Sequence, residues 1–77
     1  MPKYIDFHPG HKMSPEGIQR LTEETKKGVY DEYGVRQLEL YYGDNGVYCL
    51  LEAPDKEAVR KHHKGNCGEI HEVKSLL

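Results

Sequence analysis

The chain has 77 residues and a formal net charge of -2, with 11 basic and 13 acidic side chains mixed along it. This length is enough for one domain, expected to span residues 1–77, with a small core that oligomerisation or a bound metal would help to stabilise. The mixed charges predict no nucleic-acid partner. No apolar run approaches the roughly 20 residues that span a bilayer, and the first residues lack the apolar core of a leader peptide. We therefore expect no membrane partner and a cytoplasmic location.

The first predicted element is a strand over residues 4–8, where polar and apolar side chains alternate before a Pro-Gly pair. Side chains on a strand point to opposite faces in turn. We expect one face, with Ile5 and Phe7, to be buried, and the other, with Tyr4, Asp6 and His8, to lie on the open side of the sheet.

A long helix is predicted next. Ser14 is suited to the N-cap and Pro15 to the first helical position. Ile18 and Leu21 begin a series of residues at helical spacing that continues through Thr25 and Val29. Gly34 is then expected to end the helix in the left-handed conformation, which gives it about 18 residues.

A hairpin and a second helix follow. Residues 35–42 alternate, the Gly-Asp-Asn-Gly sequence at 43–46 predicts a reverse turn, and residues 47–53 form the returning strand. In the first of these strands, Leu38 and Leu40 are expected to share a face. Asp55 is a predicted N-cap for a helix that ends at Gly65, and a last short strand is predicted over residues 69–76.

The predicted order is β-α-β-β-α-β, the split βαβ pattern of a ferredoxin-like α+β fold. With right-handed crossovers, the four-stranded antiparallel sheet has strand order 4132 and both helices cover one face. The other face would carry several aromatic side chains. We therefore expect a homodimer that forms through the open sheet face.

This topology gathers most of the candidate ligands at one end of the sheet. The end of the first strand, the end of the second helix and the start of the last strand all meet there. The residues placed at this end by the topology are His8, His11, His62, His63, Cys67 and His71, with Asp6 as a carboxylate neighbour. The sequence therefore predicts a possible transition-metal site, because imidazole suits nickel, zinc, copper and iron.

The details of this site stay open at the level of sequence. His8 and His11 flank a Pro-Gly turn, whereas His62 and His63 point about 100° apart on a helix and are not both expected to hold one ion. Isolated histidines in polar loops are more often solvated than bound to metal. Binding needs neutral imidazole, so affinity should fall below about pH 6.5.

Three segments of the chain carry a resemblance to a known family. They are K-Y-I-D-F-H at Lys3–His8, Y-C-L-L-E-A-P-D-K-E-A-V-R-K-H-H at Tyr48–His63 and E-I-H-E-V at Glu69–Val73. With them the chain resembles a family of small bacterial and archaeal proteins of unknown function, whose best-described relatives are nickel-binding ferredoxin-like dimers. The Glu52–Arg60 segment is the most recognisable part.

The resemblance implies a dimeric α/β barrel with nickel near the sheet ends and the interface. His8 matches the family pattern best, followed by His62 or His63. The chain departs from the pattern at His71, where relatives commonly have tyrosine, and at Asn66-Cys67-Gly68. The ligand set and the identity of the metal therefore do not follow from the resemblance.

The leading hypothesis is a nickel-binding protein, or one for zinc or copper, that acts in sequestration or sensing. The alternative is a dimeric α/β-barrel enzyme for a small molecule, with His8, Asp6 and Tyr41 as base, orienting group and acid. We favour a protein that is not an enzyme. A third possibility is an interaction module whose histidines have no role in binding.

Overall fold

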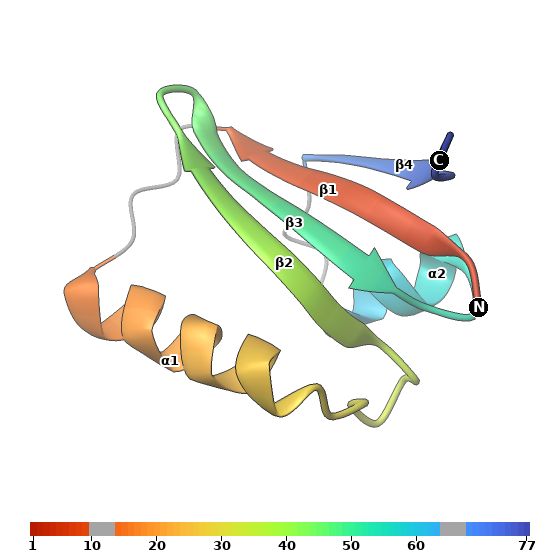
Figure 1. Ribbon diagram of the computed structural model, residues 1–77, viewed down its shortest axis with the longest axis horizontal. Coiled ribbons are helices and arrows are strands. Elements are labelled where there is room, and N and C mark those ends of the chain that lie inside the picture. Colours follow the sequence, from red (N-terminus) through yellow and green to blue (C-terminus); the bar gives the residue numbers. More distant parts are fainter. Residues whose placement is uncertain (10–13, 64–67) are drawn as a thin grey trace.

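The structure is a computed structural model that describes residues 1–9, 14–63 and 68–77. Its elements follow the predicted order (Figure 1). They are β1 (Lys3–Pro9), α1 (Pro15–Lys27), β2 (Arg36–Gly43), β3 (Gly46–Glu52), α2 (Lys56–His62) and β4 (Glu69–Val73). The described elements form an α+β arrangement in which two helices accompany one sheet.

The sheet has the order β2-β3-β1-β4, and every neighbouring pair of strands is antiparallel. This is the predicted order 4132 read from the opposite edge. β1 and β3 lie at the centre, so their helix-facing side chains form the middle of the core. The core cluster joins Leu51 and Cys49 of β3 to Val59 and Ala58 of α2, which places α2 on this face.

Both helices start where the sequence predicts, because their N-cap side chains accept backbone hydrogen bonds. Ser14 Oγ accepts from the N–H of Gly17 at 3.1 Å, and Asp55 Oδ1 accepts from the N–H of Ala58 at 2.8 Å. The end of α1 was predicted wrongly at Gly34. Gly28 adopts the left-handed conformation (φ 64°) six residues earlier, so α1 has 13 residues.

The prediction for the faces of β1 was also wrong. Tyr4 and Asp6 are 5% and 0% exposed, and their partners across the strand pair are Leu51 and Cys49 of the core. Tyr4, Asp6 and His8 therefore lie on the face that the helices cover, and Ile5 and Phe7 lie on the open face. The physical reason is that both faces of this sheet carry apolar side chains. The alternation therefore shows which residues share a face, but not which of the two faces the helices cover.

A bulge in β2 changes the alternation of that strand. Gln37 pairs with Leu51 and Glu39 pairs with Leu50, which leaves Leu38 as an extra residue between them. The helix-facing side of β2 consequently passes from Gln37 to Leu40. The prediction that Leu38 and Leu40 share a face fails for this reason.

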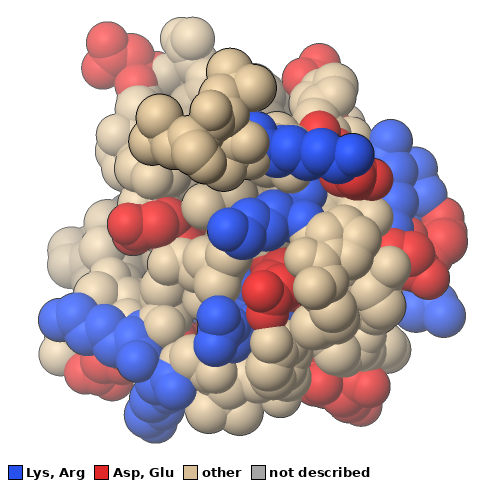
Figure 2. Space-filling view, turned by 45° about the vertical axis from the view of Figure 1, so that its right-hand side comes forward, with Lys and Arg blue, Asp and Glu red and all other residues tan. Residues whose placement is uncertain are grey.

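The open face of the sheet is apolar at its centre. The rings of Phe7 and Tyr48 stack with their centroids 4.6 Å apart, and the cross-strand pairs Ile5–Leu50 and Tyr41–Tyr48 lie on the same face. Elsewhere the surface is mixed in charge. Figure 2 shows Lys and Arg side chains interspersed with Asp and Glu over the face in view. Within residues 1–9, 14–63 and 68–77, no helix is long and apolar enough to cross a membrane.

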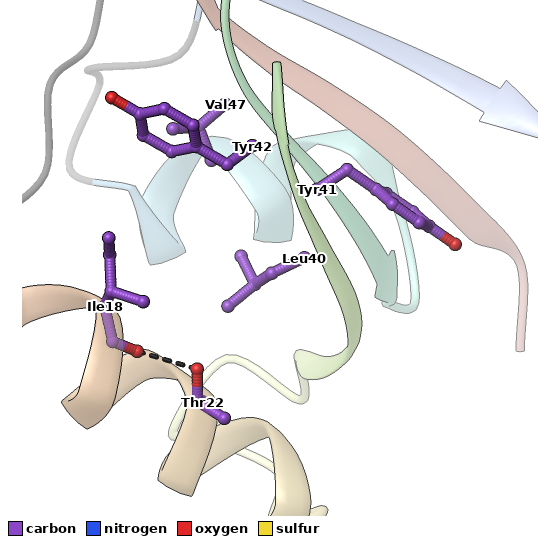
Figure 3. A pocket seen from close by; sticks show the side chains of 6 residues that line it. All are labelled: Ile18, Thr22, Leu40, Tyr41, Tyr42 and Val47. Carbon is purple, nitrogen blue, oxygen red and sulfur yellow. Dashed lines mark hydrogen bonds between the residues drawn. The ribbon is translucent and has the colours of Figure 1, made fainter.

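Helix α1 packs less tightly than α2. None of its residues is buried, and a cavity of about 120 Å³ lies between it and the sheet. Ile18 and Thr22 of α1 face Leu40 of β2 and Val47 of β3 across this space (Figure 3). Since Leu40 and Val47 are on the same face as the core residues, both helices cover one face of the sheet, as predicted.

Candidate metal centre

Asp6 is a fully buried carboxylate in the middle of the central strand β1. Its side chain is 0% exposed and lies between the sheet and α2. His8, two residues further along, points to the same face because strand side chains repeat every second residue. The Nε2 atom of His8 is 3.2 Å from Oδ1 of Asp6. β1 therefore supplies two of the polar groups of this site from one strand.

The third group is His63, which caps the C-terminus of α2. Its Nε2 atom contacts Oδ2 of Asp6, and its ring centroid is 4.7 Å from that of His8 at an interplanar angle of 66°. The backbone N–H of His63 donates to the carbonyl of Val59, a fully buried core residue, at 3.2 Å. The packing of α2 on the sheet thus brings His63 to Asp6 and His8 from far along the chain.

These three residues have the arrangement of a ligand set. One donor atom from each of Asp6, His8 and His63 lies within 4.8 Å of the others. Both carboxylate oxygens of Asp6 and Nε2 of His63 are buried, and within the described part of the chain none of them has a hydrogen-bond partner of acceptable geometry. The contact between Asp6 and His63 is an ion pair by distance and is not a hydrogen bond.

Buried polar atoms without hydrogen bonds lower the free energy of unfolding. A cation bound between Asp6 and His63 would give the two carboxylate oxygens and the imidazole nitrogen a partner. Two imidazole nitrogens with a carboxylate oxygen suit nickel, copper or zinc better than calcium or magnesium, which prefer all-oxygen ligands. The residues present at Asp6, His8 and His63 therefore fit a divalent transition metal.

His62 lies beside this site but faces a different partner. Its Nδ1 atom contacts Oδ2 of Asp31, in the loop between α1 and β2, and its ring meets the ring of His63 at 83° with the centroids 4.8 Å apart. His62 and His63 therefore contact the carboxylates of two different residues, Asp31 and Asp6.

His71 does not join the group, contrary to the predicted convergence. It pairs with Ile5 across β1 and β4, which places it on the open face, opposite to Asp6 and His8. Its side chain is 69% exposed and lies 3.4 Å from a carboxylate oxygen of Glu69. The register places His71 opposite Ile5, part-way along β1, and the alternation of β4 directs its side chain away from Asp6 and His8. His11 and Cys67 lie outside the described residues.

Sequence reasoning missed Asp31, whose carboxylate organises the α1–β2 loop. Oδ1 accepts hydrogen bonds from the N–H groups of Tyr33 (2.8 Å) and Val35 (3.0 Å). Burial acts to raise the pKa of Asp31, but the hydrogen bonds from His62 and from these N–H groups hold it below its ordinary value. The sequence signal was an Asp three residues before Gly34, a common turn pattern, but the segment was predicted to be helical.

The acid-base trio of the enzyme hypothesis is not assembled. Tyr41 pairs with Tyr48 on the open face, and its side chain points away from the cavity that its neighbours line (Figure 3). Asp6 and His8 are on the other face. Among the residues that the structure describes, the cavity is lined by Ile18, Thr22, Leu40, Tyr42 and Val47 and, at its edge, by Tyr41, and this set holds no carboxylate or imidazole.

Comparison with known families decides what kind of protein carries this site. The sequence matches the nickel-responsive SCO4226-like proteins over residues 4–73, which is nearly the whole chain. The chain belongs to this family. The assignment agrees with the resemblance seen in the sequence, and it gives the Asp6–His8–His63 group a metal-related context. No curated protein matches the chain. No solved structure matches it either.

Proposed function

We propose that this member of the SCO4226-like family binds a nickel ion through Asp6, His8 and His63 and acts in nickel sequestration or sensing. The observation that carries the proposal is the buried carboxylate of Asp6, whose two oxygens have no hydrogen bond within the described residues and lie beside the imidazoles of His8 and His63. A metal ion gives these atoms a partner. The family assignment supports nickel as that metal.

The donor set also predicts how the site ranks different metals. Nitrogen and oxygen ligands are typical of Ni²⁺ and Cu²⁺, and the affinity of such sites rises from nickel to copper. Copper should therefore bind more tightly than nickel to the isolated protein, so nickel selectivity in a cell rests on which metal is available. Three protein ligands leave further coordination positions for water or for a partner molecule.

We further propose a ferredoxin-like homodimer, with the two open sheet faces packed together as a dimeric α/β barrel. The stacked rings of Phe7 and Tyr48 and the Ile5–Leu50 pair support this arrangement, because such an apolar face is stabilised when it is covered. Asp6 and His8 point to the opposite face, under the helices. Each subunit would then hold its own ion rather than share one across the interface.

Equilibrium dialysis of tag-free, chelator-treated protein against Ni²⁺, Zn²⁺ and Cu²⁺ tests the proposal. We expect one tightly held nickel ion per chain, with X-ray absorption showing imidazole nitrogen in its first shell. Retention of none of the three metals at neutral pH would contradict a metal function. Nickel bound without imidazole ligands would contradict the site.

Sequestration and sensing differ in the effect that the bound metal has on the protein. A sensor must have two conformations that the metal distinguishes, whereas a sequestering protein needs affinity alone. Hydrogen exchange with and without nickel separates the two roles. Protection confined to β1 and the end of α2 supports sequestration, and protection that extends to the open face supports sensing.

A further inference from the structure

Asp31 is held rigidly in the loop between α1 and β2. Its backbone N–H donates to the carbonyl of Val35 at 2.9 Å, and its carbonyl accepts from the N–H of Gly34 at 3.0 Å. Its Oδ1 atom accepts two more backbone N–H bonds, from Tyr33 and Val35. Val35 is 1% exposed, which anchors the loop in the core. The position of the Asp31 carboxylate is therefore fixed by its own loop.

The other oxygen of this carboxylate faces the end of α2. Oδ2 of Asp31 contacts Nδ1 of His62, the last residue of the helix. The side chains of His62 and Asp31 are 25% and 29% exposed, so water only partly competes for the contact. A charged, oriented acceptor of this kind fixes the rotation of an imidazole ring.

His63 needs such support because it comes directly after the last helical residue. Its dihedral angles (φ -92°, ψ 4°) are not those of a regular helix, and α2 has only seven residues. The rings on either side of His63 are His62, edge-on at 4.8 Å, and His8, at 4.7 Å. A displacement of the His62 ring therefore removes one wall of the space that holds the His63 ring.

From this geometry we infer that Asp31 and His62 are positioning residues that hold the imidazole of His63 toward Asp6 and His8. The inference rests on the proposed metal function, in which His63 is a ligand and His62 is not. Partners of this kind behind a ligand typically change metal affinity by about 10- to 100-fold when they are removed. The α1–β2 loop thereby becomes part of the metal site without touching the ion.

The test compares Asp31→Asn, His62→Gln and the double variant by nickel calorimetry, at a temperature where circular dichroism shows all proteins folded. We expect each single variant to lose about tenfold in affinity. The double variant should lose little more than either single one, because the two residues act as a unit. Glu57→Gln is the matched control. It breaks the exposed Glu57–Arg60 pair on the same helix and should leave nickel affinity unchanged.

A second readout reports on His63 without metal. In the metal-free protein, the ring nitrogen resonances of His63 should shift or broaden in Asp31→Asn and stay unchanged in Glu57→Gln. A merely structural role would lower the melting temperature and leave both these resonances and the nickel affinity of the folded protein intact.

Each outcome decides the inference. Wild-type affinity in Asp31→Asn overturns it. Complete loss of binding in His62→Gln, equal to the loss in His63→Ala, also overturns it, because His62 would then be a ligand. If the wild-type protein takes up no nickel, the proposed function fails, and positioning stands or falls on whether the His63 resonances respond to Asp31→Asn.

Discussion

The imidazole of His63, at the end of α2, meets the carboxylate of Asp6, in the middle of β1, inside the layer between helix and sheet. The two residues are far apart in the sequence and come together only because α2 packs on the face of β1 that carries Asp6. His8 completes the group from the same strand. Five predictions test this relationship and its surroundings.

Asp6→Asn should affect both metal binding and stability. The substitution keeps the shape of the side chain but removes a buried charge that has no hydrogen bond, so the metal-free variant should be more stable than the metal-free wild type by about 1 kcal/mol. Nickel affinity should fall by more than about 100-fold, because a ligand is lost rather than an outer partner. Urea unfolding and calorimetry measure the two effects.

The control for Asp6 is Glu69→Gln, which neutralises an exposed carboxylate beside His71. Exposed pairs contribute little, so its stability should lie within about 0.5 kcal/mol of wild type. Equal stability of Asp6→Asn and Glu69→Gln would contradict the central role of Asp6.

The lowered pKa of Asp31 predicts that the protein loses stability in acid. Because its pKa is lowered in the folded protein, the unfolded chain takes up a proton first as the pH falls. The stabilisation is therefore complete above the ordinary carboxyl pKa, about 4, and is lost as the pH falls through the lowered value. The stability difference between wild type and Asp31→Asn should shrink from pH 6 to pH 3. Urea unfolding midpoints measured at a series of pH values over this range test this prediction. A constant difference over this range would contradict the pKa shift.

Filling the cavity under α1 should stabilise the protein. Thr22→Leu adds apolar volume toward Leu40 and Val47 and improves helix propensity, so we expect a gain of about 1 kcal/mol in unfolding free energy. Thr22→Ala is the control, because alanine has the higher helix propensity but leaves the cavity larger. If the alanine variant proves the more stable of the two, the cavity does not limit the docking of α1.

A charge on the open sheet face should separate the proposed dimer. Leu50→Glu places a carboxylate opposite Ile5, and light scattering after gel filtration should show a monomer where the wild type is a dimer. Nickel bound per chain should not change, because the three ligands lie on the other face. Lys61→Glu, a charge reversal on exposed helix surface, should remain dimeric. Loss of nickel together with the dimer would indicate a site shared between subunits.

The order of elements and the strand order were predictable because local signals specify them. Ser14 and Asp55 accept the cap hydrogen bonds expected of them, and the Gly43–Gly46 turn joins β2 to β3. The end of α1 was less certain, because Gly28 and Gly34 both adopt positive φ and either can end a helix. In the structure the first of these two glycines, Gly28, ends α1.

The faces of the strands could not be predicted from β1 alone. Ile5 and Phe7 are more apolar than Tyr4 and Asp6, yet it is Tyr4 and Asp6 that the helices cover. The pairing with β3 carries the missing information, since Asp6 lies opposite Cys49 in the core. His71 was grouped with Asp6 and His8 from the topology alone, without a prediction of the face on which it lies. The topology brought His63 near Asp6 and His8, whereas the direction of each strand side chain depended on the register.

Nickel calorimetry on tag-free wild type, His63→Ala and His71→Ala tests the metal site most directly. Each variant removes one of two histidines that the sequence predicts as ligands, but of these two only His63 contacts Asp6. A site built from Asp6, His8 and His63 predicts wild-type affinity for His71→Ala and loss of binding for His63→Ala. Unchanged binding in His63→Ala, or equal loss in both variants, would contradict it.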